Sequence, residues 1–199
     1  MISHQYRCIF VHIPRCAGTS IETWIAGGDW WTIDAGSKHL LASQAKAAYA
    51  EFWDDYFKFS IVRNPYDRII SCLKYAEHFG LVQGEDGQVD FSTYHARFGE
   101  AVVIEHDHRF FDRAQLLSPR HRPGSVYGNI LDEELDFVAR FETLAADMEV
   151  VRQATGIGEP FGHHVENSER KRPSLPPETI QIVNKIYDAD FDAFNYNLK

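Results

Sequence analysis

A loop of small residues with one arginine at its head follows the first apolar segment of the chain. The loop consists of Arg15, Cys16, Ala17, Gly18, Thr19 and Ser20. Small side chains expose backbone N–H groups, and a helix N-terminus adds a partial positive charge. Arg15 contributes a fixed charge and a bidentate fork of donors. The loop therefore predicts an anion site of the phosphate-binding type, and the alternative is a tight turn whose hydroxyls only cap the next helix.

A second arginine, Arg63, stands in a similar place in "SIVRNPYDRIIS". It leaves a predicted strand, Asn64 is the expected cap of a helix that begins at Pro65, and Ser71 lies two turns along that helix. Arg63 and Ser71 converge on one anion if the strand end folds back beside the helix. The alternative is that Arg63 pairs with Asp67 and that Ser71 only faces a neighbouring helix.

Strands and helices alternate around these two junctions. Strands are expected where short segments are rich in apolar and β-forming residues, at 7–13, 57–62, 125–131 and 136–142. Helices with end signals are expected from 19 onward, with Thr19 or Ser20 as cap, and at 43–56, 65–80, 142–156 and 177–194, while 27–37 is expected to be a loop. The pattern predicts an α/β protein with a mainly parallel sheet flanked by helices, whose ligands bind at the carboxyl ends of the strands.

Length, charge and cysteine content limit the possible functions. The 199 residues fit a single domain over 1–199, and the net charge of −9 argues against nucleic-acid binding. The three cysteines show no paired spacing, so we expect no disulfide framework and a cytoplasmic protein. Neither a membrane span nor a signal peptide is expected.

Two further chemistries are disfavoured by spacing. The loop lacks the lysine of the motif G-x-x-x-x-G-K-[ST], which argues against a nucleoside-triphosphate kinase. The histidine pairs at 106 and 108 and at 163 and 164 do not have the spacing of ligands on one helix face. We expect these histidines to be surface residues and predict no metal.

Taken together, the motifs resemble those of sulfotransferases that use 3′-phosphoadenosine 5′-phosphosulfate, especially the carbohydrate sulfotransferases grouped as family 2. "HIPRCAGTS" resembles their 5′-phosphosulfate loop, and "VRNPYDRIIS" resembles their 3′-phosphate motif. "KHLLASQ", "ARFETL" and "IYDADFDAFNY" also fit the family. The resemblance spans nearly the whole chain and is weak at 84–124. It implies the sulfotransferase fold, with a P-loop-like sheet.

The resemblance also implies roles for individual residues. His39, in "KHLLASQ", would be the general base, worth roughly 10²–10⁴-fold in rate. Arg15 would stabilise charge on the oxygen that bridges to the leaving phosphate. The 5′-phosphate would be held by Cys16, Ala17, Gly18, Thr19 and Ser20. Arg63 and Ser71 would hold the 3′-phosphate, and Arg170 is either a further contact to it or part of a solvated basic turn.

One departure from the family pattern concerns Arg15, because the family usually has lysine there. Arginine keeps the charge but does not give up a proton, so electrostatic stabilisation remains and proton donation does not.

An enzyme that sulfates a carbohydrate or similar hydroxyl acceptor is the main hypothesis, with Trp30 or Trp31 as a possible stacking surface for a sugar. The alternatives are a catalytically inactive nucleotide-binding module and a P-loop kinase. Oligomeric state is not predicted.

Overall fold

The computed structural model describes residues 1–78, 122, 124–162 and 174–199. Contacts between Cα atoms divide the chain into two compact units. The first consists of Met1–Arg63 and Tyr127–Ser168, and the second of Asn64–Val126 and Glu169–Lys199. The expectation of one domain over 1–199 stays a prediction.

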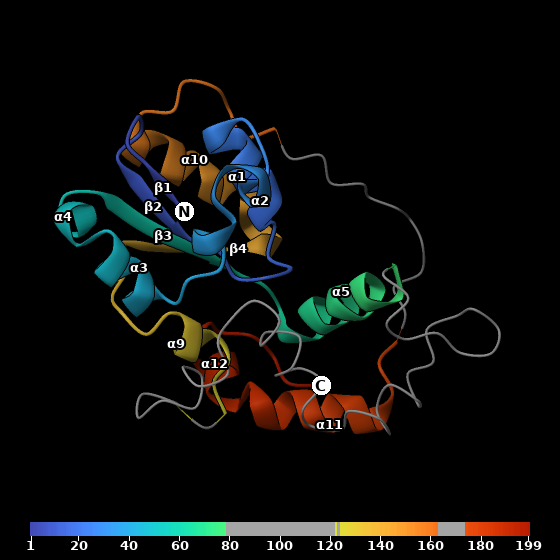
Figure 1. Ribbon diagram of the computed structural model, residues 1–199. Helices are drawn as coiled ribbons and strands as arrows, with labels where there is room; N and C mark the ends of the chain where they lie inside the picture. The colour runs from blue at the N-terminus through green and yellow to red at the C-terminus, as the bar shows by residue number, and fades with distance from the viewer. Residues whose placement is uncertain (79–121, 123, 163–173) are drawn as a thin grey trace. The chain divides into compact units, whose positions relative to one another are not determined.

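A four-stranded sheet forms the centre of the first unit (Figure 1). Its strands, in spatial order, are β1 (Ile2–Ser3), β2 (Cys8–Val11), β3 (Phe57–Val62) and β4 (Phe137–Arg140). β1 pairs antiparallel with β2, and the other two pairings are parallel. The expected α/β fold with a mainly parallel sheet is therefore confirmed.

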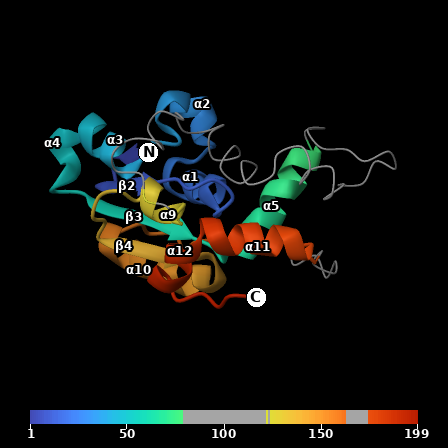
Figure 2. The same cartoon turned by 90° about the horizontal axis from the view of Figure 1, so that it is seen from below.

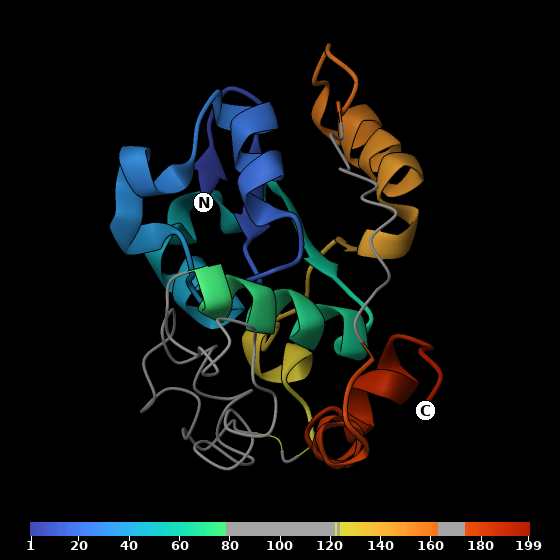
Figure 3. The ribbon, with the colours of Figure 1, turned by 90° about the vertical axis from the view of Figure 1, so that its right-hand side faces the viewer.

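Helices cover both faces of this sheet, as Figures 2 and 3 show. α1 (Gly18–Ala26), α2 (Trp30–Asp34) and α3 (Ala42–Ala48) lie on one face, and α10 (Leu144–Thr155) lies on the other. Every residue of β2 is buried, which explains its continuous apolar run. The remaining short helices of this unit are η1 (Ala35–Ser37), α4 (Ala50–Trp53), α9 (Tyr127–Ile130) and η2 (Phe141–Thr143).

In the described part of the second unit, the chain forms α5 (Pro65–His78), α11 (Pro177–Ile186) and α12 (Asp188–Ala193). α5 begins as expected, because Asn64 Oδ1 accepts a hydrogen bond from Tyr66 N at 3.1 Å. No helix in the described segments is long and apolar enough to span a membrane.

Several expected elements differ from the observed ones. Residues 125–131 form the turn of helix α9 instead of a strand, since short apolar runs suit either structure. The expected loop at 27–37 contains α2, which is capped because Asp29 Oδ1 accepts a hydrogen bond from Trp31 N at 2.9 Å. The expected helices at 43–56 and 177–194 are each broken in two, at Tyr49 and at Tyr187.

The start of α1 also differs from the expectation. Its N-cap is Ala17, in the left-handed conformation and without a side-chain cap, so Thr19 and Ser20 lie inside the helix. The helix begins earlier because the loop backbone turns sharply at Ala17.

The two ends of α1 permit a matched test of backbone strain. Ala17 has φ 65° and Gly27 has φ 76°, and a Cβ at Gly27 would meet no atom within 4 Å. The left-handed region costs a residue with a Cβ about 1–2 kcal/mol. We therefore expect Gly27→Ala to lower the free energy of unfolding by about 1 kcal/mol, and Ala17→Gly to raise it by at most about 1 kcal/mol, because glycine gains freedom in the unfolded chain. Urea denaturation measures both, and two changes of the same sign would contradict the expectation.

Candidate functional site

The loop between β2 and α1 has an unusual backbone. Arg15 has φ 67° and Ala17 has φ 65°, so two residues with side chains adopt the left-handed region within one short turn. Cys16 lies between them, is buried, and donates its backbone N–H to the carbonyl of Ile13 at 3.3 Å. Strained backbone of this kind persists where the surroundings hold it, often at a ligand site.

The first turn of α1 presents the groups that an anion site requires. The N–H groups of Gly18, Thr19 and Ser20 have no acceptor within the helix because of helix geometry. The same turn carries the partial positive charge of the helix dipole. Thr19 and Ser20 are exposed, so their hydroxyls lie at the surface beside these N–H groups. The loop and the helix start thus form one continuous candidate anion site.

Arg63 lies at the same edge of the sheet as this loop. Its Nη1 donates a hydrogen bond to the carbonyl of Arg15 at 3.2 Å. Its guanidinium carbon lies 4.0 Å from the centre of the Phe141 ring, and its own carbonyl accepts a hydrogen bond from the hydroxyl of Tyr127. The Nε atom of Arg63 is buried and has no hydrogen-bond partner among the residues that the structure describes. The side chain of Arg63 therefore contacts the backbone of Arg15 where the parallel strands β2 and β3 end.

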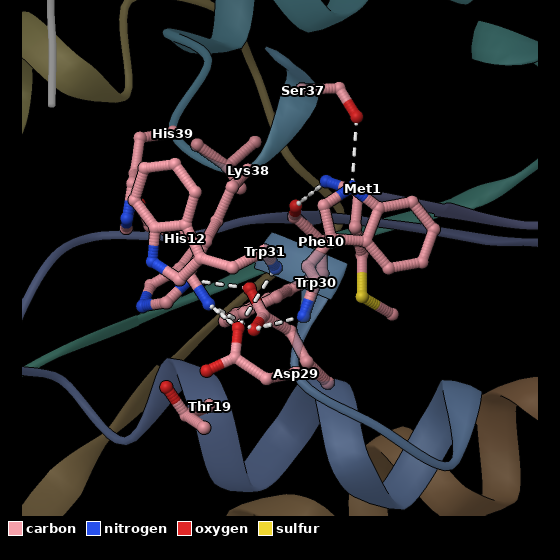
Figure 4. A network of polar contacts seen from close by, with 12 residues as sticks. Met1, Phe10, His12, Thr19, Asp29, Trp30, Trp31, Ser37, Lys38 and His39 are labelled. Carbon is pink, nitrogen blue, oxygen red and sulfur yellow. Dashed lines mark hydrogen bonds and ion pairs between the residues drawn. The ribbon is translucent and has the colours of Figure 1, made fainter. Parts of the chain in front are cut away.

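A buried ionic network, which the sequence analysis did not predict, lies behind the loop (Figure 4). Its centre is Glu22 on α1, which is 0% exposed and accepts hydrogen bonds from His12 Nδ1 at 2.6 Å and Lys38 Nζ at 2.6 Å. The backbone N–H of Trp30 also donates to Glu22, at 3.1 Å, and Lys38 pairs in addition with Asp29. One carboxylate thus joins the end of β2, helix α1, the start of α2 and the segment before His39.

A signal for this network exists in the sequence. The buried positions of α1 are Gly18, Ile21, Glu22 and Ile25, which follow the helical repeat. Glu22 is thus a charged residue on the core-facing stripe, and buried charges require partners. The helical repeat does not predict which residues are those partners, because they come from three other segments of the chain.

Burial and hydrogen bonding set the protonation states of the network. Burial lowers the pKa of His12, so the ring is neutral and its Nδ1–H donates to the carboxylate. Burial by itself would raise the pKa of Glu22, but the hydrogen bonds from His12, Lys38 and Trp30 outweigh it and lower that pKa. Glu22 is therefore ionised, and removing one partner of such a buried pair costs about 3–5 kcal/mol.

His39, the predicted general base, lies against this network. Its Nδ1 donates to the backbone carbonyl of His12 at 3.2 Å, and this donation places the lone pair on Nε2. The ring centre of His39 lies 4.4 Å from that of His12 and 5.6 Å from that of Trp31. Burial, followed by the nearby His12, lowers the pKa of His39 to about 2. The side chain is thus neutral, but so low a pKa makes it a weak base, and the predicted general-base role stays a prediction.

Gly18 connects the loop to the network through packing. A Cβ built on Gly18 would lie 1.8 Å from Nε2 of His12. The ring of His12 therefore occupies the space that any other residue at position 18 would need, which explains why the loop has glycine there.

The described contacts do not test the roles predicted for Ser71 and Arg170. Ser71 lies on α5 in the second unit and is partly buried, so its convergence with Arg63 stays a prediction. Arg170 and the histidines at 106, 108, 163 and 164 lie outside the described residues. Among the residues that the structure describes, no group of three or more histidine, cysteine, aspartate or glutamate side chains is arranged to hold a metal ion.

The fold is that of an α/β protein with a four-stranded, mainly parallel sheet flanked by helices, which is consistent with the sulfotransferase fold. The chain belongs to the sulfotransferase family, whose family model matches residues 1–197. The resemblance seen in the sequence motifs is thereby confirmed, and with it sulfonate transfer as the general activity. No curated protein and no solved structure shows a significant similarity to the chain.

Gly18→Ala tests the packing of the loop against His12. We expect the added methyl group to displace the His12 ring, break its hydrogen bond to Glu22 and lower the free energy of unfolding by about 3 kcal/mol, as breaking a buried charged pair does. Gly28→Ala is the matched control, because a Cβ there meets only atoms 4.0 Å away. Thermal and urea unfolding of both variants measure the difference, and equal effects would contradict the assigned contact.

The buried histidines predict a pH dependence of stability. The pKa values of His12 and His39 lie below the ordinary 6.5, and that of His39 is about 2, so below 6.5 the unfolded chain binds protons that the folded chain does not. The stability that these two neutral histidines contribute is therefore complete above 6.5 and falls as the pH drops, by up to about 1.4 kcal/mol per pH unit for each histidine. We expect the slope to be smaller by one proton in His39→Asn, measured by urea denaturation at several pH values. An unchanged slope would show that His39 is not held neutral by burial.

Proposed function

We propose that this protein transfers a sulfonate group from 3′-phosphoadenosine 5′-phosphosulfate to a hydroxyl group of a carbohydrate or similar acceptor. The observation that carries the proposal is the hydrogen bond from Arg63 to the carbonyl of Arg15. It brings the arginine of each motif to one sheet edge. A guanidinium held against the loop that precedes a helix N-terminus suits a ligand with several negative charges.

The residues present fit such a donor. Within the described part of the chain, the buried Nε of Arg63 has no hydrogen-bond partner, and the N–H groups at the start of α1 have no acceptor within the helix. Arg15 and the loop residues from Cys16 to Ser20 would hold the 5′-phosphosulfate end. Arg63 and Ser71 would hold the 3′-phosphate, with Arg170 as a further contact. When bound, the donor supplies an activated sulfonate.

The chain's own groups divide the remaining work. His39 would accept the proton of the acceptor hydroxyl at Nε2, since its Nδ1 is committed to the His12 carbonyl. Arg15 would stabilise negative charge on the leaving side, and its guanidinium would stay protonated throughout. The network around Glu22 would keep His39 and the loop in their relative positions.

Of the two tryptophans that are candidates for stacking on the acceptor, one suits this role better. Trp30 is 7% exposed and donates its indole N–H to Ser37, so it is a core residue. Trp31 is 50% exposed, and its ring lies edge-on to His39. Trp31 is therefore the residue we propose to stack on an acceptor ring, since aromatic faces suit the apolar faces of sugars.

Ligand binding provides the first test. Calorimetry should detect binding of adenosine 3′,5′-bisphosphate and no comparable binding of ATP with magnesium. A labelled donor incubated with a panel of hydroxyl acceptors should then transfer its sulfonate. Binding of the bisphosphate without transfer to any acceptor would support the inactive nucleotide-binding module, and binding of ATP with magnesium alone would support a kinase.

Variants of the two catalytic candidates separate turnover from affinity. We expect Arg15→Ala to lower kcat by about 10²–10³-fold with a smaller change in donor affinity, because its charge acts mainly in the transition state. We expect His39→Ala to lower kcat by about 10²–10⁴-fold, whereas Arg15→Lys should retain activity. Arg152→Ala, which removes an arginine paired with Glu149 on α10, is the control and should leave kcat unchanged. Steady-state kinetics that show lost affinity with full kcat in Arg15→Ala would refute its role.

A further inference from the structure

Phe141 determines how Arg63 is held. Val62 pairs with Arg140 across the parallel strands β3 and β4, so Arg63 and Phe141 are the next residues on two neighbouring strand ends. The guanidinium carbon lies 4.0 Å from the ring centre, which is a close cation–π contact. This contact restricts where the guanidinium can lie and so favours the direction in which its N–H groups donate.

The N–H groups of Arg63 point toward the Arg15 loop. Arg63 Nη1 donates to the carbonyl of Arg15, and the hydroxyl of Tyr127 holds the carbonyl of Arg63. Arg63 is thus held by the hydrogen bond to its carbonyl and by the contact of its guanidinium with the Phe141 ring. One of its N–H groups donates to the loop. A 3′-phosphate contact alone would not require this donation.

The loop is a segment that needs such support. Arg15 and Ala17 both have left-handed φ, and the hydrogen bond from the N–H of Cys16 to the carbonyl of Ile13 is long at 3.3 Å. A strained turn keeps its shape only when contacts from outside over-determine it. The contact from Arg63 falls on Arg15 itself, one of the two left-handed residues.

We propose that Arg63 and Phe141 form a clamp that holds the Arg15 loop in its left-handed conformation, so that Phe141 is a positioning residue for the anion site. The clamp makes Arg63 serve the 5′ end of the nucleotide site through the loop backbone, in addition to any contact with a 3′-phosphate. This proposal rests on the proposed function for its ligands but not for its geometry.

Hydrogen exchange tests the clamp without a ligand. Phe141→Leu removes the aromatic face and keeps an apolar side chain, and Phe137→Leu removes the same atoms from β4 at a position paired with Phe59 and is the matched control. We expect the amide of Cys16, which donates to the Ile13 carbonyl, to exchange at least about tenfold faster in Phe141→Leu, from a larger open fraction, and at the wild-type rate in Phe137→Leu. Equal exchange in the two variants would overturn the clamp.

Ligand binding tests which end of the site the clamp serves. We expect the Kd of both adenosine 5′-monophosphate and adenosine 3′,5′-bisphosphate to rise about tenfold in Phe141→Leu and in Arg63→Lys, measured by calorimetry or by competition. Arg63→Lys keeps the charge but loses the planar fork that stacks and donates. If only the bisphosphate binds more weakly, Arg63 acts on the 3′-phosphate alone and the proposal is wrong.

The two readouts separate this proposal from the proposed function. A wild-type protein that binds neither adenosine nucleotide would contradict the proposed donor, and hydrogen exchange alone would then decide the clamp. A wild-type protein that binds both nucleotides, with unchanged affinities in Phe141→Leu, would contradict the clamp and leave the donor assignment in place.

Discussion

The buried carboxylate of Glu22 is the interaction on which the first unit of the structure depends. A charge with no exposed surface is stable only when donors surround it, and His12, Lys38 and Trp30 supply them. These donors come from segments that are separate in the sequence. Satisfying one carboxylate therefore fixes the end of β2, the face of α1 and the segment that carries His39 relative to one another.

The same edge of the sheet concentrates positive charge in an acidic protein. The chain carries a net charge of −9, yet the Arg63 guanidinium donates to the Arg15 carbonyl where β2 and β3 end, next to the loop that leads into α1. Local field, and not net charge, governs the binding of a small anion. The negative charge of Glu22 is balanced by its own partners behind the loop. The electrostatic potential at the loop surface is therefore determined by the arginines and the start of the helix.

Elements with end signals were predictable. Strand 57–62 was expected with its observed bounds, and α10 ends before Gly156 as the glycine indicated. The errors fall where tertiary contacts decide: α9 closes a helical turn around buried side chains, and α2 begins because Asp29 caps it while also pairing with Lys38. A short apolar run does not by itself distinguish a strand from a helical turn.

For the candidate site, the sequence alone determined the family and the residue types: two arginine motifs, a small-residue loop and one histidine. These are local patterns, and the spacing of residues in a sequence gives information only about residues that are close together in the chain. Only the tertiary structure decided that Arg63 reaches the Arg15 carbonyl, that Phe141 carries its guanidinium, and that the ring of His12 fills the space beside Gly18. These contacts join residues distant in the chain, and they form because buried charges and a strained loop need partners that only the folded chain can bring to them.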